Sequence, residues 1–270
     1  MKTAIIIAGA TRQTHLTYRF WDKLPQGDLY YSTWNVSQQV YENTLYKVNN
    51  EIKNLTDCVN FKEVFVSDYQ TEFLDRKLNP FIRPFILLRK VYSKIKDQGY
   101  ERVIYFRPDI KLFYTDEYNV ETDFTVNDNT IKLLGDHWPE VFWDKENRTM
   151  NDLFFVFNWP VFELFLNNAE FICGKEIHNS LFEFFEMHKI KVEPMQTMRC
   201  AILRNNIDES NIHLGQDEIT KLFLDKFYGN ETASKYSWFW ECKFSPKEEI
   251  NTEYLEYSRN NGGILKLRKQ

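Results

Sequence analysis

A short apolar segment that ends in Arg107-Pro108-Asp109 constrains the fold of this chain more than any other feature. Residues 103–106 are β-branched and aromatic, which is typical of a buried strand. Proline cannot donate a hydrogen bond to a neighbouring strand, so we expect the strand to end there. An arginine and a carboxylate then lie at the carboxyl end of a strand, where ligands bind in open α/β sheets. Taken alone, Arg-Pro-Asp is more simply explained by an edge strand followed by a solvated turn.

Other segments favour the ligand-binding interpretation over the solvated turn. Predicted strands alternate with predicted helices, as in a parallel sheet with crossover helices. We expect paired strands around a polar turn at 124–126 and 131–134, and a strand pair or an irregular β segment over 192–203. The remaining predicted strands cover residues 4–8, 28–34, 63–68, 103–106 and 153–157. The predicted helices cover residues 37–52, 84–95, 160–166, 177–188 and 217–227.

The size and composition of the chain fit one large α/β domain. With 270 residues, 43% of them hydrophobic, the chain can bury a sizeable core, and no linker rich in Pro, Gly or Ser divides it. The net charge of −5 argues against a non-specific nucleic-acid binder. We expect no membrane span and a cytoplasmic location, because no apolar run is long enough and the first one reads as a core strand. Four widely spaced cysteines argue against zinc and disulfides: Cys58, Cys173, Cys200 and Cys242.

Common catalytic motifs are absent from the sequence. The turn after the first strand, Gly9-Ala10-Thr11-Arg12, is neither a GxGxxG nor a Walker loop. No GxSxG elbow is found. The five histidines form no HxxxH pair: His15, His137, His178, His188 and His213.

The order of short motifs resembles a known family. One strand leads into Gly-x-x-Arg at residue 9, a second ends in Ser-Thr-Trp at residues 32–34, and a third ends in Arg-Pro-Asp-Ile. Met150-Asn151-Asp152 then precedes an apolar strand. This order is similar to that of GT-A type nucleotide-sugar glycosyltransferases from bacterial surface-glycan clusters and from large viruses and phages. Members of that group carry Arg-x-Asp in place of the usual Asp-x-Asp.

The resemblance implies a fold and a domain division. It implies a GT-A-like (Rossmann-like) α/β domain, with a mostly parallel central sheet flanked by helices. We expect this nucleotide-sugar-binding and catalytic domain over residues 1–205, and a C-terminal helical and aromatic extension packed on it over residues 206–270.

The resemblance also implies roles for single residues. Gly9 and Arg12 would lie by the base and phosphates of the donor, and Thr33 and Trp34 would line the nucleoside slot. Asp109 would face a metal ion, Mn²⁺ or Mg²⁺. Arg107 stands where the family usually has its first aspartate, and its charge could replace that of the metal.

Glycosyl transfer also requires particular side chains. Negative charge builds on the leaving diphosphate as an oxocarbenium-like transition state forms, so the site needs cations. Arg83 and Arg89 are candidates for this task beside Arg12 and Arg107. An inverting enzyme needs a carboxylate base as well. Asp136 and Asp152 are candidates, although each could simply stabilise a turn.

We therefore expect an enzyme that moves a hexose or pentose from a nucleotide-sugar to a hydroxyl group. We expect the donor to be a UDP-sugar. The acceptor would be a glycan or a hydroxylated base of phage DNA, and a viral enzyme would act in the host cytoplasm. Two alternatives remain open at this point. One is a non-catalytic domain that binds nucleotides or sugars, and the other is a sugar-phosphate nucleotidyltransferase.

Overall fold

The protein is built on a central sheet of seven strands. This computed structural model describes residues 1–12, 14–39, 44–134, 143–144, 149–150, 152–174, 177–203, 208–215 and 218–219. In sheet order the strands are β12 (Lys191–Pro194), β8 (Thr130–Leu133), β11 (Phe154–Asn158), β6 (Arg102–Phe106), β1 (Thr3–Ala8), β2 (Asp28–Trp34) and β5 (Glu63–Ser67). Only β11 runs antiparallel to its neighbours β6 and β8, and the other four pairings in this sheet are parallel. The predicted mostly parallel α/β sheet is confirmed.

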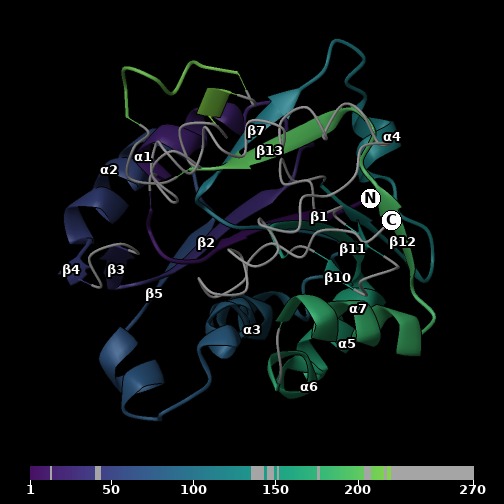
Figure 1. The fold of residues 1–270 in the computed structure, drawn as a ribbon, viewed down its shortest axis with the longest axis horizontal. Helices are drawn as coiled ribbons and strands as arrows, with labels where there is room; N and C mark the ends of the chain where they lie inside the picture. Colours follow the sequence, from purple (N-terminus) through teal and green to yellow (C-terminus); the bar gives the residue numbers. More distant parts are fainter. Residues whose placement is uncertain are drawn as a thin grey trace, which may run out of the picture.

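Two layers cover the sheet (Figure 1). Helices α3 (Arg83–Ile95), α5 (Trp159–Asn167), α6 (Ala169–Cys173) and α7 (Ile177–Met187) lie on one face. The other face carries the ribbon of β7 (Ile110–Tyr114) and β13 (Met198–Ile202), with α1 (Thr14–Thr17), α2 (Asn49–Cys58) and α4 (Val120–Phe124). The shorter elements are the hairpin β3 (Val36–Gln39) and β4 (Thr44–Lys47), the pair β9 (Trp143–Asp144) and β10 (Thr149–Met150), and the single turns η1 (Tyr18–Phe20), η2 (Gln70–Leu74) and η3 (Pro80–Ile82).

The first strand shows why the sheet is covered on both sides. Ile6 packs into the core under the helical layer, whereas Ile5 and Ile7 pack into the core under the ribbon. A strand buried on both faces reads as a continuous apolar run, as residues 4–8 do. The central sheet therefore separates two hydrophobic cores.

The helix predicted over residues 37–52 is confirmed only over 49–52; residues 37–39 and 44–47 form strands, and residues 40–43 lie outside the described residues. The chain first forms the β3–β4 hairpin and enters α2 only at Asn49. The apolar residues of this stretch fit a helical spacing, but the β-branched Val36 and Thr44 and the aromatic Tyr46 favour extended structure. Short apolar runs are ambiguous between the two periods.

The predicted pairing of residues 124–126 with 131–134 is also wrong. Phe124 ends helix α4, whose first turn is capped by the Asn119 Oδ1 accepting from the Thr122 backbone nitrogen at 3.0 Å. Strand β8 instead inserts between β11 and β12. The segments expected to pair over 192–203 likewise separate, because β12 joins the main sheet and β13 joins β7. Pairing with distant strands overrides the local turn signals in both places.

A buried lysine ties a later segment to the ribbon. Lys111 on β7 is 3% exposed, and its Nζ donates to the backbone carbonyls of Ile212 at 2.6 Å and Leu214 at 2.7 Å. Burial lowers the pKa of Lys111 to about 8, and nearby Glu218 acts in the opposite direction. Most of the predicted extension 206–270, including Cys242, lies outside the described residues.

The described cysteines are not bonded to one another: Cys58 is exposed, and Cys173 and Cys200 are buried. No helix in the described part of the chain is long and apolar enough to cross a membrane.

Candidate active site

The site lies at the edge of the sheet where the order in which the chain adds strands reverses. From β1 the chain continues to β2 on one side, whereas β6 lies on the other side of β1. The loops that follow β1 and β6 therefore flank a topological switch point, which is where open α/β sheets bind ligands. Gly9 follows β1, and a Cβ added to Gly9 would lie only 2.7 Å from Cδ of Pro108 after β6. The two loops are in direct contact, and glycine is needed to let them approach.

The Arg-Pro-Asp turn is held from three sides. Strand β6 ends at Phe106, as predicted, and it is an interior strand with neighbours on both sides. The Thr17 hydroxyl donates to the Pro108 carbonyl at 2.7 Å, and the Leu203 backbone nitrogen donates to the Asp109 carbonyl at 2.7 Å. The Arg107 backbone nitrogen donates to the Leu153 carbonyl at 3.0 Å. These hydrogen bonds hold the turn in place, so it is not a solvated surface loop.

Arg107 joins two carboxylates. Its Nε and Nη2 donate to the two carboxylate oxygens of Asp109 at 3.0 and 2.8 Å, and its Nη1 lies 3.5 Å from Oδ1 of Asp152. Asp152 reaches this edge because β11 is antiparallel, so its entry lies beside the exit of β6. Burial opposes the charge on Arg107, but the two carboxylates outweigh it and raise the pKa of Arg107. One cation between two anions leaves a single negative charge.

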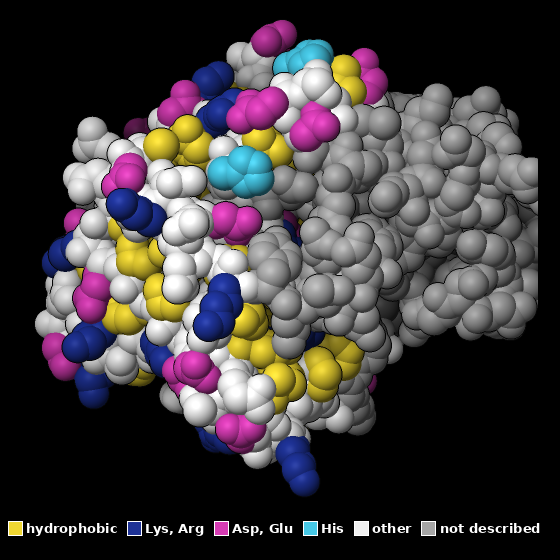
Figure 2. Space-filling view, turned by 90° about the vertical axis from the view of Figure 1, so that its left-hand side faces the viewer, with side chains coloured by type: hydrophobic (Ala, Val, Ile, Leu, Met, Phe, Trp, Pro, Cys, Tyr) yellow, Lys and Arg dark blue, Asp and Glu magenta, His cyan; other side chains and the backbone are white. Residues whose placement is uncertain are grey.

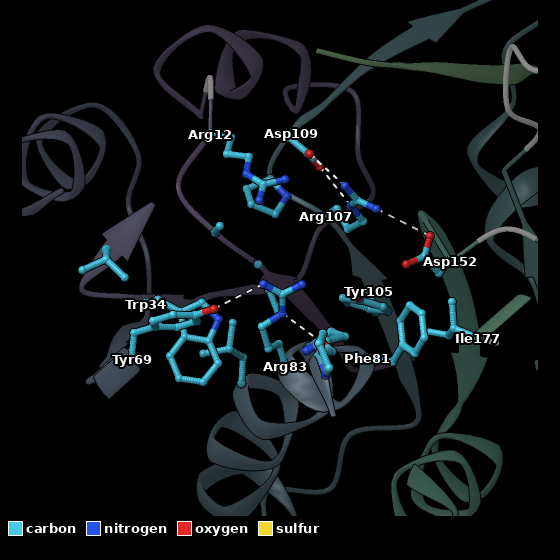
Figure 3. Close-up of a pocket in the computed structure, with 18 of the residues that line it drawn as sticks. Arg12, Trp34, Tyr69, Phe81, Arg83, Tyr105, Arg107, Asp109, Asp152 and Ile177 are labelled. Carbon is cyan, nitrogen blue, oxygen red and sulfur yellow. Dashed lines mark hydrogen bonds and ion pairs between the residues drawn. The ribbon is translucent and has the colours of Figure 1, made fainter. Parts of the chain in front are cut away.

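These residues line a cavity of about 330 Å³, a size suited to a small ligand. Three arginines reach it from different elements: Arg12 from the loop after β1, Arg83 from the start of α3, and Arg107. Figure 3 shows them between Trp34 and Tyr69 on one side and Asp152 and Ile177 on the other. We call the first side the aromatic end of the cavity and the second side the carboxylate end.

The aromatic end is rigid. The rings of Trp34 and Tyr69 meet edge to face, with centroids 5.3 Å apart. Arg83 donates from Nε to the Pro80 carbonyl at 2.8 Å and from Nη1 to the Tyr69 hydroxyl at 3.4 Å. Its guanidinium is therefore oriented before any ligand arrives.

The carboxylate end contains Asp152, Tyr105, Ile177 and His178. Burial, followed by the nearby charge of Asp152, raises the pKa of the Tyr105 hydroxyl. The His178 ring holds its Nδ1 2.7 Å from the carbonyl oxygen of Met150 on β10. Sequence reasoning missed Tyr69, Tyr105 and His178, because none of them lies in a motif and only the packing of α7 on β10 brings His178 here.

Seven of the predicted site residues meet in this cavity: Gly9, Arg12, Trp34, Arg83, Arg107, Asp109 and Asp152. Thr33 lies elsewhere, because its fully buried hydroxyl pairs with that of Thr11 at 2.9 Å beneath the loop that carries Arg12. Thr33 therefore supports the loop rather than lining the slot. Asp136 lies outside the described residues.

Arg89 also lies away from the cavity. Its guanidinium pairs with Glu170 at 3.0 Å and donates to the Leu166 carbonyl at 3.0 Å, in a groove between α3 and α6. Arg83 and Arg89 are six positions apart on α3, and at 3.6 residues per turn this separates them by about 120° around the helix axis. Only one of the two arginines can face the sheet edge.

Comparison with known proteins gives a fold likeness and no sequence family. No protein-family model matches the chain, and no curated protein matches it. Among solved structures, the apo form of mouse xyloside xylosyltransferase 1 is similar, with 13% sequence identity, 72% of this chain and 85% of that chain covered, and a TM-score of 0.38.

Proposed function

We propose that the protein is a glycosyltransferase that uses a nucleotide-sugar donor. The observation that carries this proposal is the convergence of Arg12, Arg83 and Arg107 in one cavity at the switch point of the sheet. A guanidinium group can donate two parallel hydrogen bonds to the oxygens of a phosphate, and it remains charged at any physiological pH. Arg12 and Arg83 together carry two positive charges, which exceed the single negative charge left on Arg107, Asp109 and Asp152, so the lining of this cavity of about 330 Å³ is net positive and suits a diphosphate.

The two ends of the cavity support an orientation for the donor. Trp34 and Tyr69 offer an apolar wall for a nucleoside at the aromatic end, where bases commonly contact aromatic rings. The diphosphate would lie along the arginines, and the sugar would point toward Asp152 and His178. In this orientation the bond that breaks lies between the cations and the carboxylate end.

The arginines would then act on the leaving group. As the bond from the anomeric carbon to the diphosphate lengthens, its electron pair moves onto the phosphate oxygen. Fixed cations stabilise this growing charge without reorganising, which is the largest single effect in many enzymes. The orientation of Arg83 by Pro80 and of Arg107 by Asp109 fits that requirement.

The expected metal ion fits the described side chains poorly. Both Asp109 oxygens accept hydrogen bonds from Arg107, and Asp152 contacts the same guanidinium. Among the residues that the structure describes, no group of three or more His, Cys, Asp or Glu side chains could hold a metal ion. We therefore propose that the arginines, rather than Mn²⁺ or Mg²⁺, neutralise the charge of the leaving group.

The acceptor supplies a hydroxyl group, and a glycan suits this protein better than DNA does. Duplex DNA is bound through a surface of concentrated positive charge. On the described part of the face in Figure 2, Lys and Arg alternate with Asp and Glu. The net charge of the whole chain is −5. A hydroxylated DNA base remains the second candidate to test.

A thermal-shift panel of UDP-, GDP-, CMP- and dTDP-sugars, each with Mn²⁺ or with EDTA, tests the proposal. A ligand that binds the native state raises its melting temperature by mass action. We expect one nucleotide class to stabilise the protein equally in Mn²⁺ and in EDTA, and Arg12→Ala to lose most of that shift. The absence of any shift, in all four classes, contradicts a nucleotide-sugar site.

Product analysis separates the alternative functions. Transfer releases a nucleoside diphosphate or monophosphate and a glycosylated acceptor. A nucleotidyltransferase would instead consume a nucleoside triphosphate and a sugar phosphate and release pyrophosphate. A non-catalytic domain would show the thermal shift without turnover on any glycan or hydroxymethylated DNA.

A further inference from the structure

The protonation of the His178 ring is fixed by its partner. Nδ1 lies 2.7 Å from the Met150 carbonyl oxygen, and a carbonyl oxygen can only accept a hydrogen bond. Nδ1 must therefore carry a proton. In the neutral ring, Nε2 is then the unprotonated nitrogen and is able to accept a proton.

His178 belongs to the carboxylate end of the cavity. It is the second residue of α7, it lines the cavity together with Asp152, and its neighbour Ile177 stands beside Asp152 in Figure 3. The carbonyl that holds its ring belongs to Met150, two residues before Asp152. The carbonyl that holds the His178 ring and the Asp152 carboxylate thus come from the same stretch of chain.

Asp152 is less suited to proton transfer than its position suggests. Its carboxylate forms an ion pair with Arg107 at 3.5 Å. Protonating Asp152 would end that ion pair while the leaving group still needs Arg107 in place. The ion pair suits Asp152 to holding Arg107 in position.

We propose that Nε2 of His178 is the general base for the acceptor hydroxyl, an inference that rests on the proposed function. The proton of the acceptor hydroxyl moves to Nε2, and the freed oxygen forms a bond to the anomeric carbon. The bond from that carbon to the donor phosphate breaks, and its electron pair leaves with the phosphate beside the arginines. The base and the leaving group lie at opposite sides of the sugar, so the reaction inverts the anomeric configuration.

His178→Asn is the informative variant, because an asparagine amide retains a donor for the Met150 carbonyl and removes Nε2. We expect kcat/KM to fall about 100-fold or more, the typical contribution of a general base. Donor affinity by calorimetry is expected to stay unchanged, and the acidic limb of the pH profile of kcat/KM to disappear. NMR of the product should show the inverted anomer for the wild-type enzyme. His188→Asn is the matched control, since His188 lies beyond the other end of α7 against Phe184, and its rate should match the wild type.

The outcomes separate this inference from the proposed function. A wild-type protein that binds no nucleotide-sugar contradicts the proposed function itself. If the donor binds, a His178→Asn enzyme with a normal rate and an intact acidic limb overturns the role of His178, as does a retained anomer. Loss of that limb in Asp152→Asn, with the limb intact in His178→Asn, would give the role to Asp152. A wild-type pH profile of kcat/KM without an acidic limb overturns the inference without any variant.

Discussion

The aromatic end and the carboxylate end of the cavity are assembled in different ways. The aromatic end and its arginines come from the last residue of β2, from the loops that leave β1, β5 and β6, and from the start of α3. The carboxylate end comes from the end of β6, from the entry of the reversed strand β11 and from the start of α7, which is held by the short β10. Parallel strands bring their exits to one edge by topology alone, whereas the other end depends on one antiparallel pairing and one helix contact.

The two ends also differ in what holds them. Buried hydroxyl contacts fix the loops beside the aromatic end, namely Thr11 with Thr33 at 2.9 Å and Thr17 with the Pro108 carbonyl at 2.7 Å. Charge joins the carboxylate end to the rest of the site, through the ion pair of Arg107 with Asp152 at 3.5 Å. Arg107 is therefore the residue on which both ends depend, and its removal should have the largest effect.

Arg107→Met is expected to lower both stability and transfer. The substitution removes the guanidinium that pairs with the carboxylate of Asp109, whose side chain is 3% exposed. Breaking a buried ion pair in this way costs about 3–5 kcal/mol. We expect the free energy of unfolding in urea to fall by about that amount, and transfer to fall below detection. Adding Asp109→Asn to Arg107→Met should restore part of the stability and none of the transfer. If Arg107→Met alone were as stable as the wild type, the two ends of the cavity would be independent.

Arg83→Met tests the aromatic end alone, with Arg89→Met on the same helix as the control. Arg83 is oriented into the cavity, and a hydrogen bond to a charged group contributes about 1.5–3 kcal/mol, so donor affinity should fall roughly 10- to 100-fold. Arg89 forms an exposed ion pair with Glu170, which contributes at most about 1 kcal/mol to stability and should leave donor binding unchanged. Calorimetry on both variants checks this, and equal affinities for the donor would remove Arg83 from the site.

Gly9→Ala tests the contact between the loops after β1 and β6. The added Cβ would lie 2.7 Å from Pro108 Cδ, and overpacking of this kind costs about 1–3 kcal/mol. Because the turn that carries Arg107 must move, donor affinity should also fall. Gly99→Ala is the control: its φ of +71° makes any side chain strained by about 1–2 kcal/mol, but no atom lies within 4 Å and the cavity is distant. A similar loss of stability with unchanged donor affinity in both variants would contradict the role of the Gly9 contact.

Lys111 is expected to have the smallest effect on donor binding, because its effect is a dependence of stability on pH. Its pKa is about 8 in the folded protein against an ordinary value of 10.5, because burial disfavours the charge. Between these two values the unfolded chain binds more protons than the folded one, so the stability contributed by this group rises with pH and is lowest below pH 8. From pH 7.5 to pH 10, the urea midpoint of the wild type should therefore rise relative to the midpoint of Lys111→Met. Parallel pH curves for the two proteins would show that Lys111 titrates normally.

The sequence predicts the parallel part of the structure and only part of the site. Apolar runs and the proline after β6 predict β1, β2, β5 and β6, and strands that share a direction place Gly9 and Arg107 at one edge. The hairpin after Val36 was missed because its apolar residues also fit a helical spacing. The difference between Arg83 and Arg89 could not be predicted, since a sequence does not give the rotation of a helix about its axis. His178 carries no local signal, because its position depends on a carbonyl 28 residues away.

The reversed strand has a consequence for how this fold can diversify. The segment that delivers Asp152 enters β11, so the part of the chain between Leu134 and Thr149 can change in length or composition without shifting the register of β1, β2 or β6. The entropic cost of a longer connection grows only slowly with its length. Under the proposed function, the acceptor could therefore change through this one connection while the residues proposed to bind the donor stay the same.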